Sequence, residues 1–227
     1  LDTRMNYLPA IEMEPEQKAN AAIIWLHGLG ASGDDFAAIV PALGLSKKAD
    51  ADLQIRFIFP HAPSIPISIN GGMNMPAWYD ILSIDVQRKI NQQQFMASAQ
   101  QVKDLIEREL DRGISSDRIL VAGFSQGGAV AYQVALNFEQ PLAGLMALST
   151  YVASPDTLEL KACNKQLPVM VFHGSEDTVV SESLGQLALS QVQALGLEPE
   201  YKQYVMGHSV SPRQIKDMAE FITRVFN

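Results

Sequence analysis

The sequence has 227 residues, 47% of them hydrophobic and 19% charged, with a formal net charge of −8. This composition is typical of a single globular domain with a substantial apolar core, and it excludes a disordered chain. Because an acidic protein repels phosphate groups, nucleic acid and anionic membrane surfaces are disfavoured as partners.

Short apolar runs alternate with longer amphipathic stretches along the chain. Several of the apolar runs are unbroken, as in parallel strands that are covered on both faces. The alternation predicts an α/β fold, with a mostly parallel central sheet, helices on both of its faces and one domain over residues 1–227. The predicted strands are 21–26, 55–60, 118–122, 144–148, 169–172 and 200–204, and the predicted helices are 95–110, 126–137, 182–195 and 213–226.

One segment does not fit this alternation. Residues 62–80 are rich in Pro, Gly and Asn, with Met and Trp interspersed, and they are too many for an ordinary connection. We therefore expect residues 65–80 to form a substrate loop or lid.

A candidate nucleophile lies in residues 123–128, with the sequence GFSQGG, which follow a predicted strand and open a predicted helix. This is the G-x-S-x-G arrangement, in which a serine occupies a strained strand-to-helix turn. Gly123 and Gly127 lack the side chains that would crowd such a turn. The pattern favours Ser125 as a nucleophile at the carboxyl edge of the sheet, and a glycine-rich turn around a buried serine is the alternative.

A serine hydroxyl is a poor nucleophile unless a neighbouring base takes its proton. Of the four histidines, His208 lies between the last predicted strand and the last predicted helix, where it can reach the carboxyl edge of the sheet. His27, His61 and His173 each follow or end a strand, and we expect their rings to fix loops through hydrogen bonds. His208 is therefore the predicted base.

The base needs a carboxylate that holds its tautomer and stabilises its charged form. Glu176 and Asp177 both follow the predicted strand 169–172, and either one could instead cap a helix. The order Ser125, Asp177, His208 along the chain is the one that accompanies a nucleophile on this kind of turn.

The oxyanion of an acyl-transfer intermediate must meet fixed hydrogen-bond donors. We expect one donor to be the backbone N–H of Gln126, directly after the nucleophile, and the other to be that of Leu29 in the segment WLHGLG at 25–30. That segment lacks the lysine and the glycine spacing of phosphate-binding loops. No H-E-x-x-H motif or Cys/His cluster is present, so no metal site is expected.

These motifs together resemble the carboxylesterase and acyl-protein thioesterase family of α/β-hydrolases, also called the phospholipase/carboxylesterase family. The resemblance extends from about residue 21 to residue 226. It is carried by WLHGLG at 25–30, FPHAP at 59–63, NGGM at 70–73, MPAWYD at 75–80, GFSQGG at 123–128, His173-Gly174 with Asp177, and Gly207-His208. The NGG stretch and ALSTY at 147–151 are most similar to the bacterial carboxylesterase branch.

The resemblance implies catalytic roles for Ser125, Asp177 (rather than Glu176) and His208, and oxyanion donors at Leu29 and Gln126. It also implies an acyl groove beneath the loop 65–78, with a lining that includes Met73, Met75 and Trp78, for which packing in the core is the alternative. Members of the family need no cofactor, are typically cytosolic, and in some bacterial cases form homodimers.

The predicted activity is that of a serine carboxylesterase acting on short- to medium-chain esters through an acyl-enzyme. The alternatives are an acyl-protein thioesterase or a lysophospholipase-like enzyme, and, from another class, a catalytically silent binding module. Cys163 is the only cysteine, so no disulfide forms within the chain and a cytoplasmic location is expected. No signal peptide and no apolar run of the ~18 residues that span a bilayer is evident.

Overall fold

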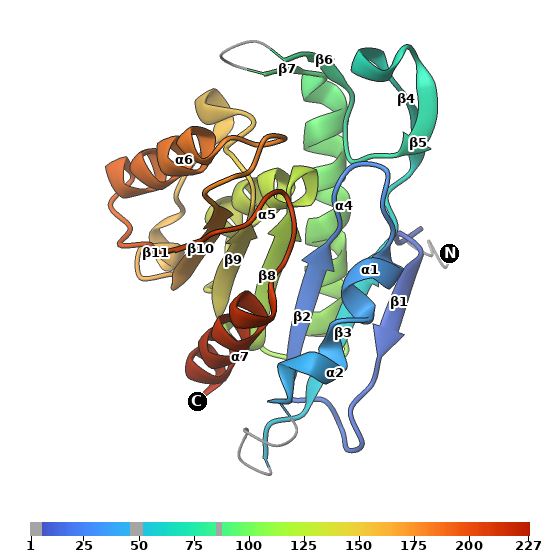
Figure 1. Ribbon diagram of the computed structural model, residues 1–227. Coiled ribbons are helices and arrows are strands. Elements are labelled where there is room, and N and C mark those ends of the chain that lie inside the picture. The colour runs from blue at the N-terminus through green and yellow to red at the C-terminus, as the bar shows by residue number, and fades with distance from the viewer. Residues whose placement is uncertain (1–5, 46–51, 85–87) are drawn as a thin grey trace.

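The computed structural model describes residues 6–45, 52–84 and 88–227, and it is built around a seven-stranded sheet (Figure 1). The strand order is β1-β3-β2-β8-β9-β10-β11, and only the β1–β3 pair is antiparallel. The predicted parallel α/β sheet is therefore confirmed. The strands are β1 (Ala10–Met13), β2 (Ala21–Leu26), β3 (Ile55–Pro60), β8 (Ile119–Phe124), β9 (Gly144–Leu148), β10 (Val169–Gly174) and β11 (Glu200–Tyr204).

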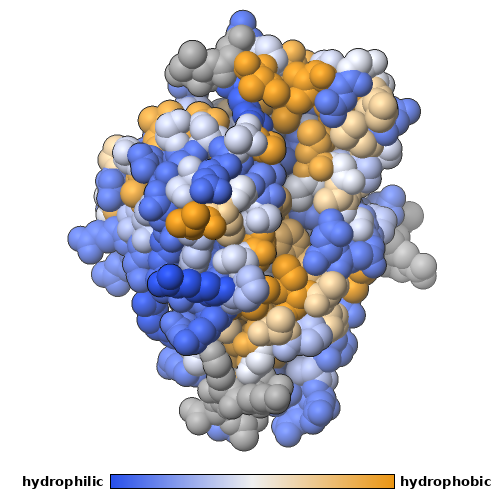
Figure 2. All heavy atoms as spheres, viewed as in Figure 1, coloured by the Kyte–Doolittle hydropathy of each residue, from blue (hydrophilic) through white to orange (hydrophobic). Residues whose placement is uncertain are grey.

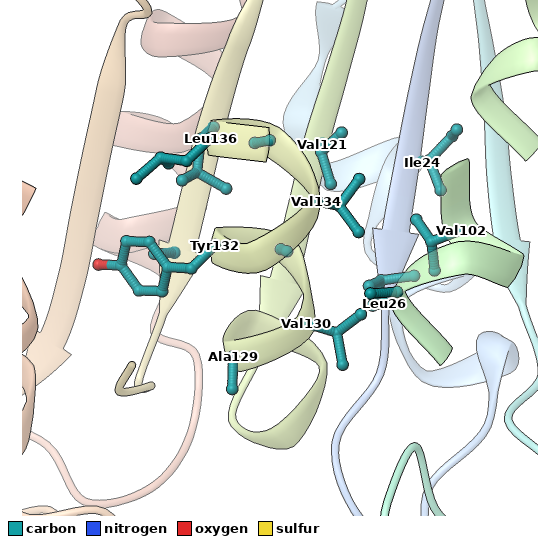
Figure 3. Close-up of a cluster of buried hydrophobic side chains, with 14 of the residues drawn as sticks. Ile24, Leu26, Val102, Val121, Ala129, Val130, Tyr132, Val134 and Leu136 are labelled. Atoms are coloured by element: carbon teal, nitrogen blue, oxygen red, sulfur yellow. The ribbon is translucent and has the colours of Figure 1, made fainter. Parts of the chain in front are cut away.

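Helices cover both faces of the sheet because alternate strand residues point to opposite sides. Ile24 and Val121 belong to a core shared with α4, α5 and α6, whereas the neighbouring Ile23 and Leu120 belong to a core shared with α1, α2 and α7. Figure 3 shows the first core, where side chains of α4 and α5 meet those of β2 and β8. The helices are α1 (Gly33–Ala37), α2 (Val40–Leu43), α4 (Gln92–Asp111), α5 (Gln126–Asn137), α6 (Glu182–Ala194) and α7 (Pro212–Phe226).

The segment predicted as a loop or lid contains a β-hairpin. Strands β4 (Ser64–Ile67) and β5 (Met73–Pro76) pair antiparallel and are joined by the short 3-10 helix η1 (Ser68–Asn70). Gly71 and Gly72, with φ of 65° and 78°, form the turn back into β5 in a backbone region that favours glycine. A second hairpin, β6 (Ile81–Ser83) and β7 (Lys89–Ile90), lies near it at the top of the molecule (Figure 1).

Within the described ranges, no helix combines the length and the apolar character that crossing a bilayer requires.

Candidate active site

Ser125 occupies the sharp turn between β8 and α5, with φ 52° and ψ −120°. A residue with a side chain is strained at such a positive φ, so the surrounding contacts must hold it there. The backbone N–H of Ser125 donates to the carbonyl of Leu148 at 2.9 Å, and the hydroxyl of Thr150 donates to the carbonyl of Ser125 at 2.6 Å. The last residue of β9 and Thr150, just after that strand, thus fix the turn.

The glycines on either side of Ser125 allow the turn to pack tightly. A Cβ at Gly123 would collide with the carbonyl of Gly127, and a Cβ at Gly127 would collide with the carbonyls of Leu26 and His27 at the end of β2. The backbones of β2, β8 and α5 therefore approach one another more closely than side chains would permit.

We expect Gly127→Ala to lower the free energy of unfolding by at least about 1–3 kcal/mol and to reduce activity, because β2 and α5 must separate to admit the methyl group. Gly207→Ala is the matched control, since its Cβ would meet one atom only, at 3.8 Å. Urea unfolding of both variants measures the difference. Equal stability of the two variants would contradict this account of the turn.

His208, in the loop after β11, and Asp177, in the loop after β10, form a hydrogen-bonded pair. His208 Nδ1 lies 2.7 Å from Asp177 Oδ2, and Asp177 Oδ1 accepts from the backbone N–H groups of Val179 and Val180, both at 2.9 Å. The carboxylate is fully buried and both of its oxygens have partners, so its orientation is fixed. With its Nδ1 proton held by Asp177, the imidazole keeps Nε2 unprotonated in its neutral form.

His208 and Ser125 lie beside one cavity. Both residues line a cavity of about 550 Å³, and the ring of Phe124, directly before the serine, lies 4.7 Å from the His208 ring between centroids. Glu176, the other acidic candidate, is exposed and lines no part of this cavity. The structure thus places the three predicted catalytic residues in one constellation.

The remaining histidines bond to loops, as the sequence predicts. The Nδ1–H of His27 donates to the next carbonyl, and its Nε2 accepts from the N–H of Ala62 at 3.0 Å. Burial lowers the pKa of His27, which keeps this ring neutral. His61 accepts from the N–H of Gly33, and His173 donates to a backbone carbonyl in the loop that carries Asp177.

Leu29 and Gln126, the two predicted oxyanion donors, both line the cavity beside Ser125. Gln126 is the first residue of α5, where a backbone N–H has no partner within the helix. Its side chain is fully occupied: Oε1 accepts from the N–H of Trp78 and Nε2 donates to the carbonyl of Tyr79, each at 2.7 Å. The Gln126 side chain therefore ties the start of α5 to the segment after β5.

The same segment also holds the loop of the second oxyanion donor. The indole N–H of Trp78 donates to the carbonyl of His27 at 2.8 Å, and the N–H of Gly30 donates to the carbonyl of Pro76 at 2.8 Å. Residues 76–79 thus brace both Leu29 and Gln126, which fixes the relative position of the two donors.

We expect Trp78→Phe to lower kcat and to cost about 1–3 kcal/mol of stability, because it leaves the buried His27 carbonyl without its donor. Trp25→Phe is a matched control, since the buried indole nitrogen of Trp25 has no hydrogen-bond partner in the described residues. Steady-state rates and thermal unfolding test both variants. An equal loss of kcat in the two would show that the brace has no role in catalysis.

The three residues predicted to line the acyl groove lie outside the cavity. Trp78 is only 1% exposed and lies beside His27 in the core, with 5.1 Å between ring centroids and the ring planes tilted by 37°. Met73 is 65% exposed at the start of β5, and Met75 lies close to Gly30. The structure does not bring these side chains to the cavity beside Ser125: Met73 faces the solvent, Met75 lies against the loop after β2, and Trp78, which follows β5, is packed in the core.

Apolar residues of other segments line the cavity instead. They come from the α1–α2 region, from η1 and the β6–β7 hairpin, and from the loops that follow β10 and β11. Figure 2 shows hydrophobic residues gathered along this face of the molecule. The lining residues that sequence reasoning missed include Phe36, Ile39, Ile69, Ile81, Ile84, Val179 and Val210.

The described residues contain no group of three or more His, Cys, Asp or Glu side chains that could hold a metal ion. That the protein needs no cofactor stays a prediction.

Comparison with known proteins places this chain among the α/β-hydrolases that act through a serine. The sequence profile of the phospholipase/carboxylesterase family matches residues 8–226. The chain therefore belongs to the phospholipase/carboxylesterase family and is a serine hydrolase.

Individual relatives agree with this assignment. The chain is 35% identical over 229 residues to acyl-protein thioesterase 1 of Neurospora crassa, covering 95% of this chain and 91% of the relative. The crystal structure of acyl-protein thioesterase 2 from Zea mays superposes with a TM-score of 0.81 at 25% identity, covering 97% of this chain and all of that one. The crystal structure of SOBER1 from Arabidopsis thaliana superposes with a TM-score of 0.80 at 29% identity, covering 92% of this chain and all of that one. A position nearest the bacterial carboxylesterase branch stays a prediction.

Proposed function

We propose that the protein hydrolyses carboxylic esters of apolar acyl groups through an acyl-enzyme on Ser125, with His208 as base and Asp177 as the orienting acid. The observation that carries this proposal is the cavity that holds Ser125 and His208 while Asp177, fixed by two backbone N–H groups, bonds the far side of the imidazole. This is the constellation that nucleophilic acyl transfer requires.

In the proposed reaction, Ser125 Oγ attacks the carbonyl carbon and its proton passes to His208 Nε2. The tetrahedral oxyanion accepts hydrogen bonds from the N–H groups of Leu29 and Gln126. Collapse of the intermediate breaks the bond to the leaving group, which takes the proton from His208. Water then attacks the acyl-enzyme in the same way and releases the acid.

A second candidate activity is that of an acyl-protein thioesterase, which the names of the relatives favour. The same residues would serve it, because only the leaving group changes from an alcohol to a thiol. Initial rates on matched esters and thioesters of one acyl group, each with Ser125→Ala as blank, decide between the two. A thioester kcat/KM well above that of the ester would favour the second candidate.

The cavity supports a preference for apolar acyl groups. Each buried methylene is worth ~0.8 kcal/mol, or about fourfold in kcat/KM, until the space is filled. We expect log kcat/KM to climb with acyl-chain length and then break, and Ile69→Ala to move the break because Ile69 lines the cavity. Met73→Ala is the control. If Met73→Ala moved the break and Ile69→Ala did not, the acyl groove predicted from the sequence would be supported instead.

A cytoplasmic location and a homodimer also belong to the proposal. The single cysteine, Cys163, favours a reducing compartment, since no disulfide can form within the chain. Fractionation of cells and light scattering of the purified protein test the two statements.

A further inference from the structure

A second cavity of about 330 Å³ adjoins the one that contains Ser125. The two share the lining residues Ile84, Arg88, Thr178 and Val179, so they lie side by side between the β6–β7 hairpin and the loop that carries Asp177. The other residues that line the second cavity are Ser181, Ser183 and Leu184. The second cavity therefore offers a guanidinium and three hydroxyl groups, whereas the walls near Ser125 are mostly apolar.

Arg88 has no anionic partner in the part of the chain that the structure describes. One Nη donates to the carbonyl of Val179 at 2.5 Å, and the guanidinium carbon lies 4.8 Å from the centroid of the Tyr151 ring. Its Nε is buried with no hydrogen-bond partner. A guanidinium carries five N–H donors, and within the described residues those of Arg88 have acceptors only in the Val179 carbonyl and the Tyr151 hydroxyl.

The neighbours of Arg88 do not neutralise its charge. Burial raises the pKa of Tyr151, and its hydroxyl is hydrogen-bonded to that of Tyr79 at 2.7 Å, so the phenol stays uncharged. Asp35 lines the first cavity but not the second. The carboxylate of Glu182 lines neither cavity and bonds to side chains of β11.

By contrast, Arg56, Arg108 and Arg112 all pair with the buried carboxylate of Glu109. A half-buried cation without an ion pair among the described residues gains from a ligand that supplies an anion. Because the chain carries a net charge of −8, carboxylates outnumber cations. An arginine with no carboxylate partner among the described residues is therefore stronger evidence for an anionic ligand than it would be in a basic protein.

We infer that Arg88 is a specificity-determining residue that binds a carboxylate or phosphate group carried by the substrate. The inference rests on the proposed ester hydrolysis and narrows its substrate class to esters that carry an anionic group. The planar guanidinium, held against the Tyr151 ring and by the Val179 carbonyl, lines both cavities, where an anion with two oxygens can accept hydrogen bonds from its Nη groups. Thr178, Ser181 and Ser183 add hydroxyl groups to the lining of the second cavity, those of Ser181 and Ser183 being hydrogen-bonded to each other at 2.9 Å.

The test compares charged with neutral esters in two arms. In the first arm the charge is on the acyl side, with the nitrophenyl monoester of glutaric acid against nitrophenyl pentanoate. In the second it is on the leaving group, with carboxyphenyl acetate against phenyl acetate. Arg88→Met should lower the charged-to-neutral ratio of kcat/KM about tenfold or more in one arm, Arg88→Lys should keep part of it, and added salt should lower the wild-type ratio.

Lys165→Met is the matched control, because it removes the same charge from an exposed residue that lines neither cavity. The arm that responds to Arg88→Met identifies which side of the ester carries the anion. If Arg88→Met slowed neutral and charged esters equally, the charged-to-neutral ratio of kcat/KM would stay unchanged in both arms. Arg88 would then have only a structural role, and the inference would be overturned.

Binding of glutarate to Ser125→Ala protein, measured by calorimetry, separates this inference from the proposed function. The additional change Arg88→Met should weaken that binding about tenfold, whether or not any ester is hydrolysed. If the wild-type protein hydrolysed no ester, the proposed function would fail while glutarate binding still decided the inference. If the wild-type protein hydrolysed neutral esters but Arg88→Met did not change the affinity for glutarate, only the inference would fail.

Discussion

Ser125→Ala is expected to lower kcat by several orders of magnitude while the protein stays folded and still binds substrate. The change removes the atom that forms the acyl-enzyme, and no other hydroxyl can replace it on the strained turn between β8 and α5. The surrounding hydrogen bonds of the turn involve the backbone of Ser125, so they survive the substitution. Single-turnover and steady-state rates on a nitrophenyl ester measure the loss.

Ser149→Ala is a close control for this experiment. Ser149 is also a buried serine with a positive φ, of 47°, and its hydroxyl has no hydrogen-bond partner in the described residues. Its loss should leave kcat within a few-fold of wild type. Adding His208→Ala to Ser125→Ala should cost little more, because the two act as a unit. A Ser125→Ala protein that kept a tenth or more of the wild-type rate would remove Ser125 from the mechanism.

The sheet and the catalytic constellation could be predicted because both depend on long, regular patterns. Each predicted catalytic residue follows its own strand, and parallel strands bring their carboxyl ends to one edge. That is why residues as distant in sequence as Ser125 and His208 could be placed together. The groups that orient Asp177 could not be predicted, because they are the backbone N–H groups of Val179 and Val180, which every residue but proline carries.

Short elements escaped prediction for a physical reason. Strand β1 has four residues and pairs with β3 some fifty positions away along the chain, so no local period marks it. The same holds for α1 and α2, which are too short to show an amphipathic repeat, yet they supply Phe36 and Ile39 to the cavity. The lining of the cavity is thus assembled mostly from segments whose local sequence carries little signal.

The segment 65–80 shows where composition alone stops short of a structure. Its Pro, Gly and Asn content predicts a loop or lid, whereas much of the segment pairs as the hairpin β4–β5 beside the loop that carries Leu29. A large apolar side chain in such a segment suits a groove and a core equally well. The indole of Trp78 lies in the core because its N–H has an acceptor there, the His27 carbonyl.

Asp177→Asn is expected to reduce kcat far more than Glu176→Gln, although both changes replace one acidic neighbour by its amide. In the native protein Oδ1 of Asp177 accepts from the N–H groups of Val179 and Val180, and Oδ2 faces Nδ1 of His208. The two backbone N–H groups will hold the amide oxygen of the asparagine in the Oδ1 position. The amide NH₂ then faces His208 and donates to Nδ1.

That reversed hydrogen bond selects the imidazole tautomer with its proton on Nε2, which cannot accept the proton of Ser125. The same exchange of tautomers costs about 10⁴-fold in serine proteases, and we expect a loss of that order here. Glu176 is exposed outside the cavity, so Glu176→Gln should change kcat less than about twofold, within the small effects typical of exposed sites. Because Asn matches Asp in size, thermal unfolding should show that the Asp177→Asn protein remains folded. The opposite ranking of the two variants would assign the acid to Glu176 and refute the role given to Asp177.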